Sequence, residues 1–142
     1  MSDTPRTPYL GRYLIAVLAL TIGFMVFVNL VARLTGILLP GGAVAILPPM
    51  IAALHVGQVW GKERGAVPES AVAWRWAAVA GLVFLAVQLL LMPVMLAGAG
   101  AITGQMMGLI AGLVAGTTIM AVLVHRLFLV MGAKGAVARP KG

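Results

Sequence analysis

Four long apolar stretches dominate this chain, and short segments that are polar or contain proline or glycine separate them. We place them at about residues 13–35, 47–62, 72–97 and 103–130. A helix of roughly 20 residues, rising 1.5 Å per residue, crosses the roughly 30 Å of hydrocarbon in a bilayer. Hydrophobic residues make up 62% of the chain and charged residues only 9%, which excludes an ordinary soluble domain. The sequence therefore predicts an all-α polytopic membrane protein, one membrane domain over residues 1–142 with four transmembrane helices.

The second stretch is the least regular of the four, because Pro48 and Pro49 interrupt it. Proline is tolerated in the first turn of a helix, where its missing N–H has no intrahelical partner to lose. We therefore expect this helix to begin near Leu47, after the Pro40-Gly41-Gly42 turn.

The basic residues indicate how the chain is oriented. Nine of the ten Lys and Arg lie before the first stretch, at or near the junction of the second and third, or near the end of the fourth and beyond it, and only Arg33 lies toward the other side. The positive-inside rule then places both termini in the cytoplasm. All Trp and Tyr residues are predicted at that same boundary as an aromatic belt, namely Tyr9, Tyr13, Trp60, Trp74 and Trp76. The net charge of +7 points to anionic lipids as partners, and not to nucleic acid.

Several kinds of chemistry are excluded by residue type. The chain has no cysteine, and its serines, Ser2 and Ser70, lie outside the apolar stretches. The three carboxylates also lie outside them, whereas proton- or cation-coupled transport usually uses a carboxylate within a span. We expect no enzymatic activity, no metal site and no cofactor. Bound lipid is compatible with this composition.

Glycine recurs at every fourth position in the last apolar stretch. In a bilayer, small residues at this spacing let two helix backbones approach closely. The sequence therefore predicts a helix-packing surface, either inside the monomer or against another molecule. A second line of small residues lies in the second stretch. The predicted packing residues are Gly100, Gly104, Gly108, Gly112 and Gly116 in the ladder, and Ala53, Gly57 and Gly61 in the second line.

Two pairs of polar residues are candidates for a ligand site. Asn29 and Arg33 lie four apart, and His55 and Gln58 lie three apart, so each pair shares a helix face. For Arg33 we favour contact with headgroups, and for Asn29 a hydrogen bond to a neighbouring helix. His55 and His125 could together ligate a b-type haem, but their predicted depths differ, so haem is disfavoured. Gln88, Gln105, Thr117 and Thr118 are expected to join helices by hydrogen bonds.

The order of these features resembles a family of small four-span bacterial inner-membrane proteins of uncharacterised function. The resemblance rests on the Pro-Gly-Gly turn, Leu47-Pro48-Pro49, and the segment 53–58 leading into the charged loop 61–69. It implies a multi-pass protein of the bacterial inner membrane. Our first hypothesis is a non-enzymatic protein that acts by helix packing, as an accessory subunit of a membrane complex or as a self-associating unit. A small transporter or channel component is the alternative, and a b-type haem protein stands third.

Overall fold

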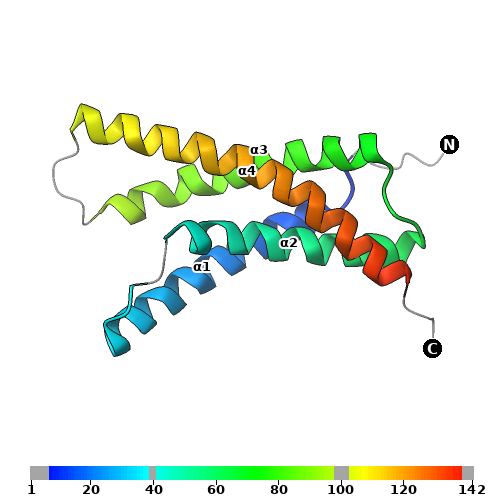
Figure 1. Ribbon diagram of the computed structural model, residues 1–142, viewed down its shortest axis with the longest axis horizontal. Helices are drawn as coiled ribbons and strands as arrows, with labels where there is room; N and C mark the ends of the chain where they lie inside the picture. Colours follow the sequence, from blue (N-terminus) through cyan, green and yellow to red (C-terminus); the bar gives the residue numbers. More distant parts are fainter. Residues whose placement is uncertain (1–6, 39–40, 98–102, 139–142) are drawn as a thin grey trace.

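The computed structural model describes residues 7–38, 41–97 and 103–138, and within these residues it is all-helical (Figure 1). Its four helices are α1 (Leu10–Thr35), α2 (Gly41–Arg64), α3 (Ser70–Leu96) and α4 (Gly104–Val137). They alternate in direction, so the start of α1 and the end of α4 lie at the same end of the molecule (Figure 1). We call this the terminal end, and the opposite end the far end.

Three of the helices are long and apolar enough to cross a membrane, namely α1, residues Ser70–Val94 of α3, and α4. With 34 residues, α4 is about 51 Å long, so it is longer than the hydrocarbon thickness requires. The helix α2 does not belong to this group of three. It is the helix that carries Pro48, Pro49, His55 and Gln58 within its length.

Local sequence explains where the helices end. Gly36 terminates α1 in the left-handed conformation, with φ of 71°, and its N–H donates to the carbonyl of Ala32. Glycine reaches this conformation without the steric cost of a Cβ. At the start of α4, the Thr103 hydroxyl accepts a hydrogen bond of 3.3 Å from the Met106 amide. This is the N-cap contact that threonine provides to the third residue of a helix.

The start of α2 differs from our expectation. The helix begins at Gly41, and Pro48 and Pro49 lie inside it, not in its first turn. Each proline removes one backbone donor from the helix, but both rings are fully buried by neighbouring helices. Gly41 and Gly42, which we expected in a turn, belong to the first turn of α2, whereas Pro40 and Gly100 of the ladder lie outside the described residues.

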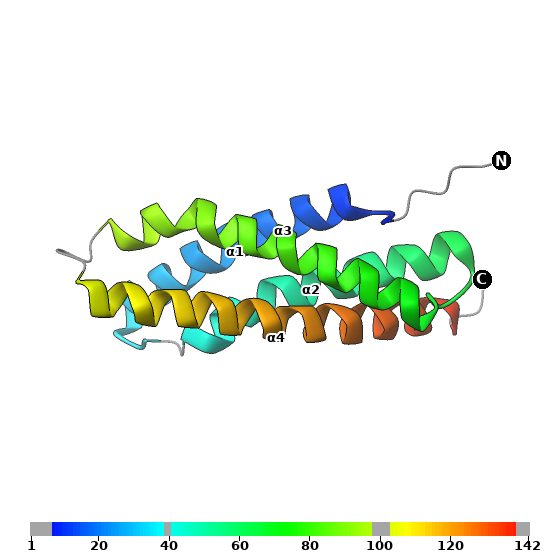
Figure 2. The same cartoon turned by 90° about the horizontal axis from the view of Figure 1, so that it is seen from above.

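The tightly packed core lies toward the terminal end. All four helices run along the long axis of the molecule (Figure 2), and α4 packs most extensively against α2 and then against α3. Buried residues occur at 13–17 of α1, 48–61 of α2, 73–87 of α3 and 121–133 of α4. In contrast, the described residues of 18–38, 88–97 and 103–120 include none that is buried. The bundle is therefore packed in one half, and its helices spread apart in the other (Figure 1).

Candidate functional site

Small residues make a close contact between α2 and the terminal half of α4. A Cβ added at Gly57 would overlap the backbone carbonyl of Leu129, and one added at Gly132 would overlap the carbonyl of Leu54. At Gly61 a Cβ would lie 2.6 Å from the carbonyl oxygen of Ala133. Ala53, one turn before Gly57, is fully buried. The line of Ala53, Gly57 and Gly61 therefore does bring two helix backbones together.

The glycine ladder of α4 lies elsewhere. A Cβ at Gly104, Gly108, Gly112 or Gly116 would meet no atom within 4 Å among the described residues. All four glycines are exposed. The sequence allowed the ladder to pack either inside the monomer or against another molecule. The described residues show no packing of these four glycines inside the monomer. We call this surface, Gly104, Gly108, Gly112 and Gly116, the glycine face.

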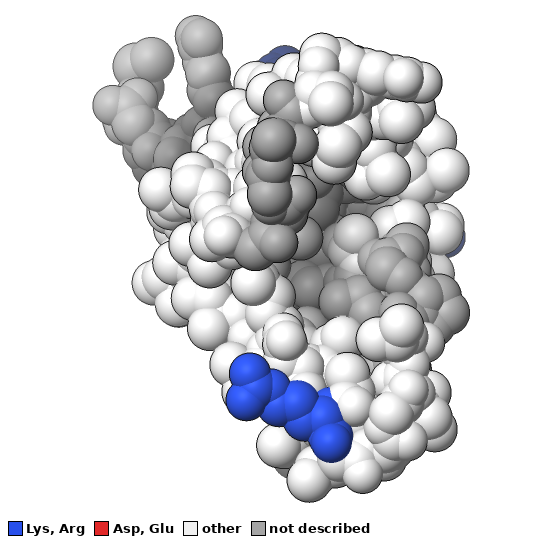
Figure 3. Space-filling view, turned by 90° about the vertical axis from the view of Figure 1, so that its left-hand side faces the viewer, with Lys and Arg blue, Asp and Glu red and all other residues white. Residues whose placement is uncertain are grey.

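The glycine face belongs to the loosely packed half of the molecule. Figure 3 looks onto the far end, which is hollowed between the helix ends and is mostly uncharged where it is described. A groove of about 520 Å³ runs between the far halves of α3 and α4. Its lining is apolar apart from Thr118 and consists of Leu85, Leu89, Met92, Met107, Ile110, Ala111, Val114, Ala115, Thr118 and Ile119.

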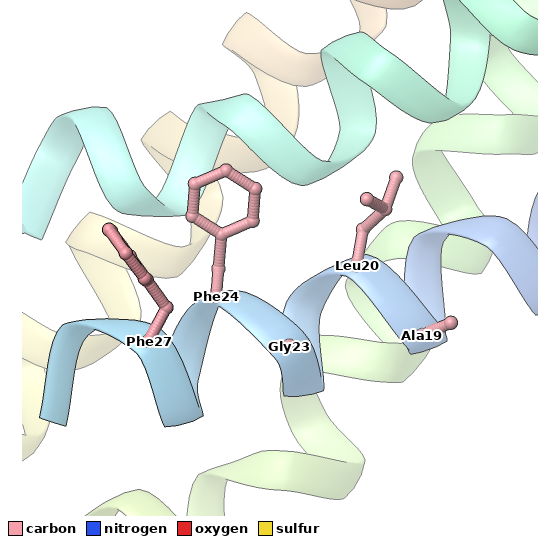
Figure 4. Close-up of a pocket in the computed structure, with 5 residues that line it drawn as sticks. All are labelled: Ala19, Leu20, Gly23, Phe24 and Phe27. Atoms are coloured by element: carbon pink, nitrogen blue, oxygen red, sulfur yellow. The ribbon is translucent and has the colours of Figure 1, made fainter. Parts of the chain in front are cut away.

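A second, smaller depression lies on α1. It has a volume of about 360 Å³ and is lined by Ala19, Leu20, Gly23, Phe24 and Phe27. Leu20 and Phe24 extend toward α2, while Gly23 leaves the space beside them open (Figure 4). Phe24 and Phe27 meet edge to face, with ring centroids 6.5 Å apart. This surface carries no titratable group, so it is suited to apolar contacts only.

The polar residues that the sequence singled out are not gathered into one site. Asn29 and Arg33 are both exposed near the far end of α1. The Asn29 amide donates to the carbonyl of Met25 in its own helix at 2.8 Å, so the expected bond to a neighbouring helix is wrong. The reason is that an exposed amide satisfies a local carbonyl four residues earlier. His55 is exposed on α2, and Gln58 is half-buried.

The predicted polar contact between α3 and α4 is confirmed in part. The Thr117 hydroxyl donates to Gln88 Oε1 at 3.2 Å, and Gln88 Nε2 donates to the Thr118 hydroxyl at 3.5 Å. The Thr118 hydroxyl donates to the carbonyl of Val114 at 2.7 Å, and the single proton of the Thr117 hydroxyl has the carbonyls of Leu113 and Val114 as alternative acceptors to Gln88. Gln105, by contrast, is exposed. The network closes the inner end of the groove, where the well-packed half of the molecule begins.

A buried tyrosine–histidine pair is the main polar feature of the core. Tyr13 Oη and His125 Nε2 share a hydrogen bond of 2.6 Å, and both residues are fully buried. The Trp76 ring meets Tyr13 edge to face at 5.4 Å, and its Nε1 donates to the carbonyl of Pro8 at 3.0 Å. Phe84 lies 6.2 Å from the imidazole. The pair links α1 to α4 through an otherwise apolar, aromatic interior.

This arrangement corrects the interpretation of the aromatic residues. Tyr13 and Trp76 are fully buried and Trp60 is 4% exposed, so these three rings pack helices together and do not form an outward belt. Trp74 is exposed at 43%. Buried Tyr and Trp are stable only with partners for their polar atoms, and His125 and the carbonyl of Pro8 supply these.

The two histidines therefore have different surroundings. His125 is enclosed by aromatic rings with Nε2 bonded to Tyr13, whereas His55 faces outward. His125 Nδ1 is buried and has no hydrogen-bond partner among the described residues. Within the same residues, no group of three His, Asp or Glu side chains is arranged to hold a metal ion. The pair acts as a fixed contact between helices.

Cations lie over aromatic rings at the terminal end. The Arg64 guanidinium is 4.5 Å above the Trp60 ring, and Arg126 is 4.7 Å above the Trp74 ring. Arg12 forms an exposed ion pair of 3.1 Å with Glu63. Stacking of this kind holds the guanidinium groups against the helix ends.

Comparison with protein-family models, with curated proteins and with solved structures finds no match to this chain. The resemblance drawn from the sequence therefore stays an expectation. The functional argument rests on the residues of the chain itself.

Proposed function

We propose that this protein is a non-enzymatic component of the bacterial inner membrane that acts by helix packing, joining another membrane protein or a second copy of itself through the glycine face of α4. One observation carries the proposal. Three other helix glycines, Gly57, Gly61 and Gly132, touch backbone of a facing helix, whereas the four on the glycine face touch nothing in the described residues.

Helix energetics support a partner for this face. Glycine inside a helix destabilises it by roughly 0.5–1 kcal/mol relative to alanine. Gly104 is the first residue of α4, so the three interior glycines of the face cost the helix about 1.5–3 kcal/mol. At Gly57 and Gly132 this cost is offset by close contact between helices. The described residues offer the glycine face no such compensation. A helix from another chain would provide it, because small residues allow the close approach on which association in lipid depends.

The proposal includes four crossings with both termini in the cytoplasm. The chain leaves the terminal end along α1, and α2 returns it there before α3 leaves again (Figure 1). A returning helix must itself cross. We assign that crossing to α2, whose prolines and small residues are covered by the other helices. Six of the seven described Lys and Arg lie toward the terminal end, and this bias supports a cytoplasmic position for it.

Copurification tests the association. Affinity-tagged protein extracted from its native membrane in mild detergent should bring down a stoichiometric partner or a second copy. The Gly112→Leu variant should lose it, because a branched side chain holds the two backbones apart. Gly135→Leu is the matched control, since Gly135 is also an exposed glycine of α4 but lies outside the glycine face. If both variants retain the same companions, the glycine face is not the interface.

The transporter alternative has a separate test. A carrier or pore must expose polar groups to its solute, and Arg33 and His55 are the charged or titratable candidates. We expect no solute flux above that of empty vesicles when the protein is reconstituted in liposomes. Flux that Arg33→Gln or His55→Leu abolishes would favour the transporter over the packing protein.

A further inference from the structure

We propose that Arg126, Ser70 and Trp74 form a binding site for a phosphate group at the terminal end of α3 and α4. The phosphate would be carried by an anionic lipid headgroup or be free in solution. This site is separate from the glycine face and does not depend on the proposed association.

The site is built around one guanidinium group. Arg126 lies on α4 with its guanidinium carbon 4.7 Å from the centroid of the Trp74 ring. Its Nη2 donates to the Ser70 hydroxyl oxygen at 3.3 Å. The plane of the guanidinium is thus held between two residues of the first turns of α3, and its position does not depend on a flexible side chain alone.

The charge of Arg126 is incompletely compensated. Its Nε is buried and has no hydrogen-bond partner among the described residues, so one edge of the cation has lost water without gaining an acceptor. Arg12 differs, because Glu63 neutralises it at 3.1 Å. Among the described side chains, Arg12 and Glu63 form the one ion pair, and Arg126 has no acidic partner. A dehydrated cation without an acid favours an anion at its remaining exposed edge.

The start of α3 adds donors at the same place. The helix begins at Ser70, and the side chain of its N-cap residue, Glu69, makes no capping hydrogen bond. The first amides of a helix have no intrahelical acceptor and carry partial positive charge. The Ser70 hydroxyl, which accepts from Arg126, keeps its own proton to donate. Guanidinium and hydroxyl donors together suit the oxygens of a phosphate.

The location fits a lipid headgroup. Trp74 is 43% exposed, and Trp is enriched at the level of headgroups. The site lies at the end where most of the basic residues are found. Glu69 is the acidic residue beside it in the chain and opposes an anion, so its removal should strengthen binding.

The test measures the dissociation constant of the first phosphatidylglycerol bound to the purified full-length protein, by native mass spectrometry in a zwitterionic detergent. Arg126→Gln should weaken this binding about tenfold, as expected for loss of a charge-assisted hydrogen bond. Arg12→Gln is the control, because it removes the same charge from the same end of the molecule. It should change the constant by much less.

Two further arms keep the test decisive. Glu69→Gln, an exposed substitution that removes no hydrogen bond, should tighten binding even if Arg126→Gln proves unstable. Inorganic phosphate is added as a competitor. If it displaces the lipid at comparable concentration, the site serves free phosphate, and if it does not, the site serves headgroups. Equal weakening by Arg12→Gln and Arg126→Gln would show a diffuse surface potential and overturn the site, as would a Glu69→Gln variant that binds no more tightly.

Discussion

The contact between α2 and α4 gives the sharpest prediction for stability. A Cβ placed on Gly57 would overlap the Leu129 carbonyl oxygen, lie 2.9 Å from the carbonyl carbon, and lie 3.1 Å from the Ala133 amide nitrogen. All three atoms belong to backbone, so no side-chain rotation can relieve the overlap. The Gly57→Ala variant must push the two helices apart along the most extensive contact in the molecule.

The expected change in the free energy of unfolding of Gly57→Ala follows from two opposing effects. Overpacking costs about 1–3 kcal/mol, and a rigid backbone neighbour favours the upper part of that range. Replacing glycine by alanine inside a helix stabilises the helix by about 0.5–1 kcal/mol. We expect Gly57→Ala to lower the free energy of unfolding by about 2 kcal/mol. Gly112→Ala, where a Cβ meets nothing, should leave the stability of the isolated protein unchanged or raise it by up to about 1 kcal/mol.

The assay is reversible unfolding of purified protein in mixed micelles with increasing dodecyl sulfate, followed by tryptophan fluorescence. Trp60 and Trp76 lie in the packed half, so their emission reports loss of this contact. The two variants must be compared at the same detergent fraction. Equal midpoints for Gly57→Ala and Gly112→Ala would refute the argument, because they would mean that close contact at Gly57 carries no energetic weight.

Three other predictions concern the polar contacts and the topology. Tyr13→Phe leaves His125 Nε2 buried without a partner and should cost about 1–3 kcal/mol in the same unfolding assay, whereas adding His125→Phe should recover part of the loss. A double variant that is less stable than either single variant would argue against the pair. Gln88→Leu removes the bonds to Thr117 and Thr118 and should cost about 1 kcal/mol, because hydrogen bonds between membrane helices contribute only about 0.6 kcal/mol each on average. A loss of several kcal/mol would contradict that reasoning. Reporter fusions after Leu38 and after Gly142 should report opposite sides of the membrane, and a common side would exclude four crossings.

The helical architecture was accessible from the sequence because apolar length is a strong signal in lipid. Helices α1, α3 and α4 correspond to the predicted stretches, and their observed ends lie near the expected ones, apart from the longer terminal end of α4. The predicted start of α2 near Leu47 was wrong, because it assumed that Pro48 and Pro49 lie in the first turn. Proline favours the first turn of a helix. Pro48 and Pro49 nevertheless lie inside α2, where both rings are fully buried.

The internal packing was harder to predict, because sequence spacing does not say which of two small-residue lines meets a neighbour. Gly57 and Gly108 each have small residues four positions before and after them, yet among the described residues Gly57 faces a backbone and Gly108 does not. The pairing of Tyr13 with His125 joins residues 112 positions apart, and no local rule connects them. One signal was present: His125 lies four residues after Ala121 and four before Leu129, so it shares their helix face, and that face is buried.

The central claim is that the glycine face of α4 contacts another protein in the membrane, and site-specific photocrosslinking tests it most directly. Benzoylphenylalanine replaces Ile119, which is 68% exposed and lies three residues beyond Gly116 on the same side of the helix. Leu82 of α3, which is 64% exposed, serves as the control position. On irradiation of native membranes, we predict a protein adduct from position 119, none from position 82, and loss of the adduct when Gly112→Leu is added. Lipid adducts alone at position 119, or the same protein adduct at both positions, would contradict the account.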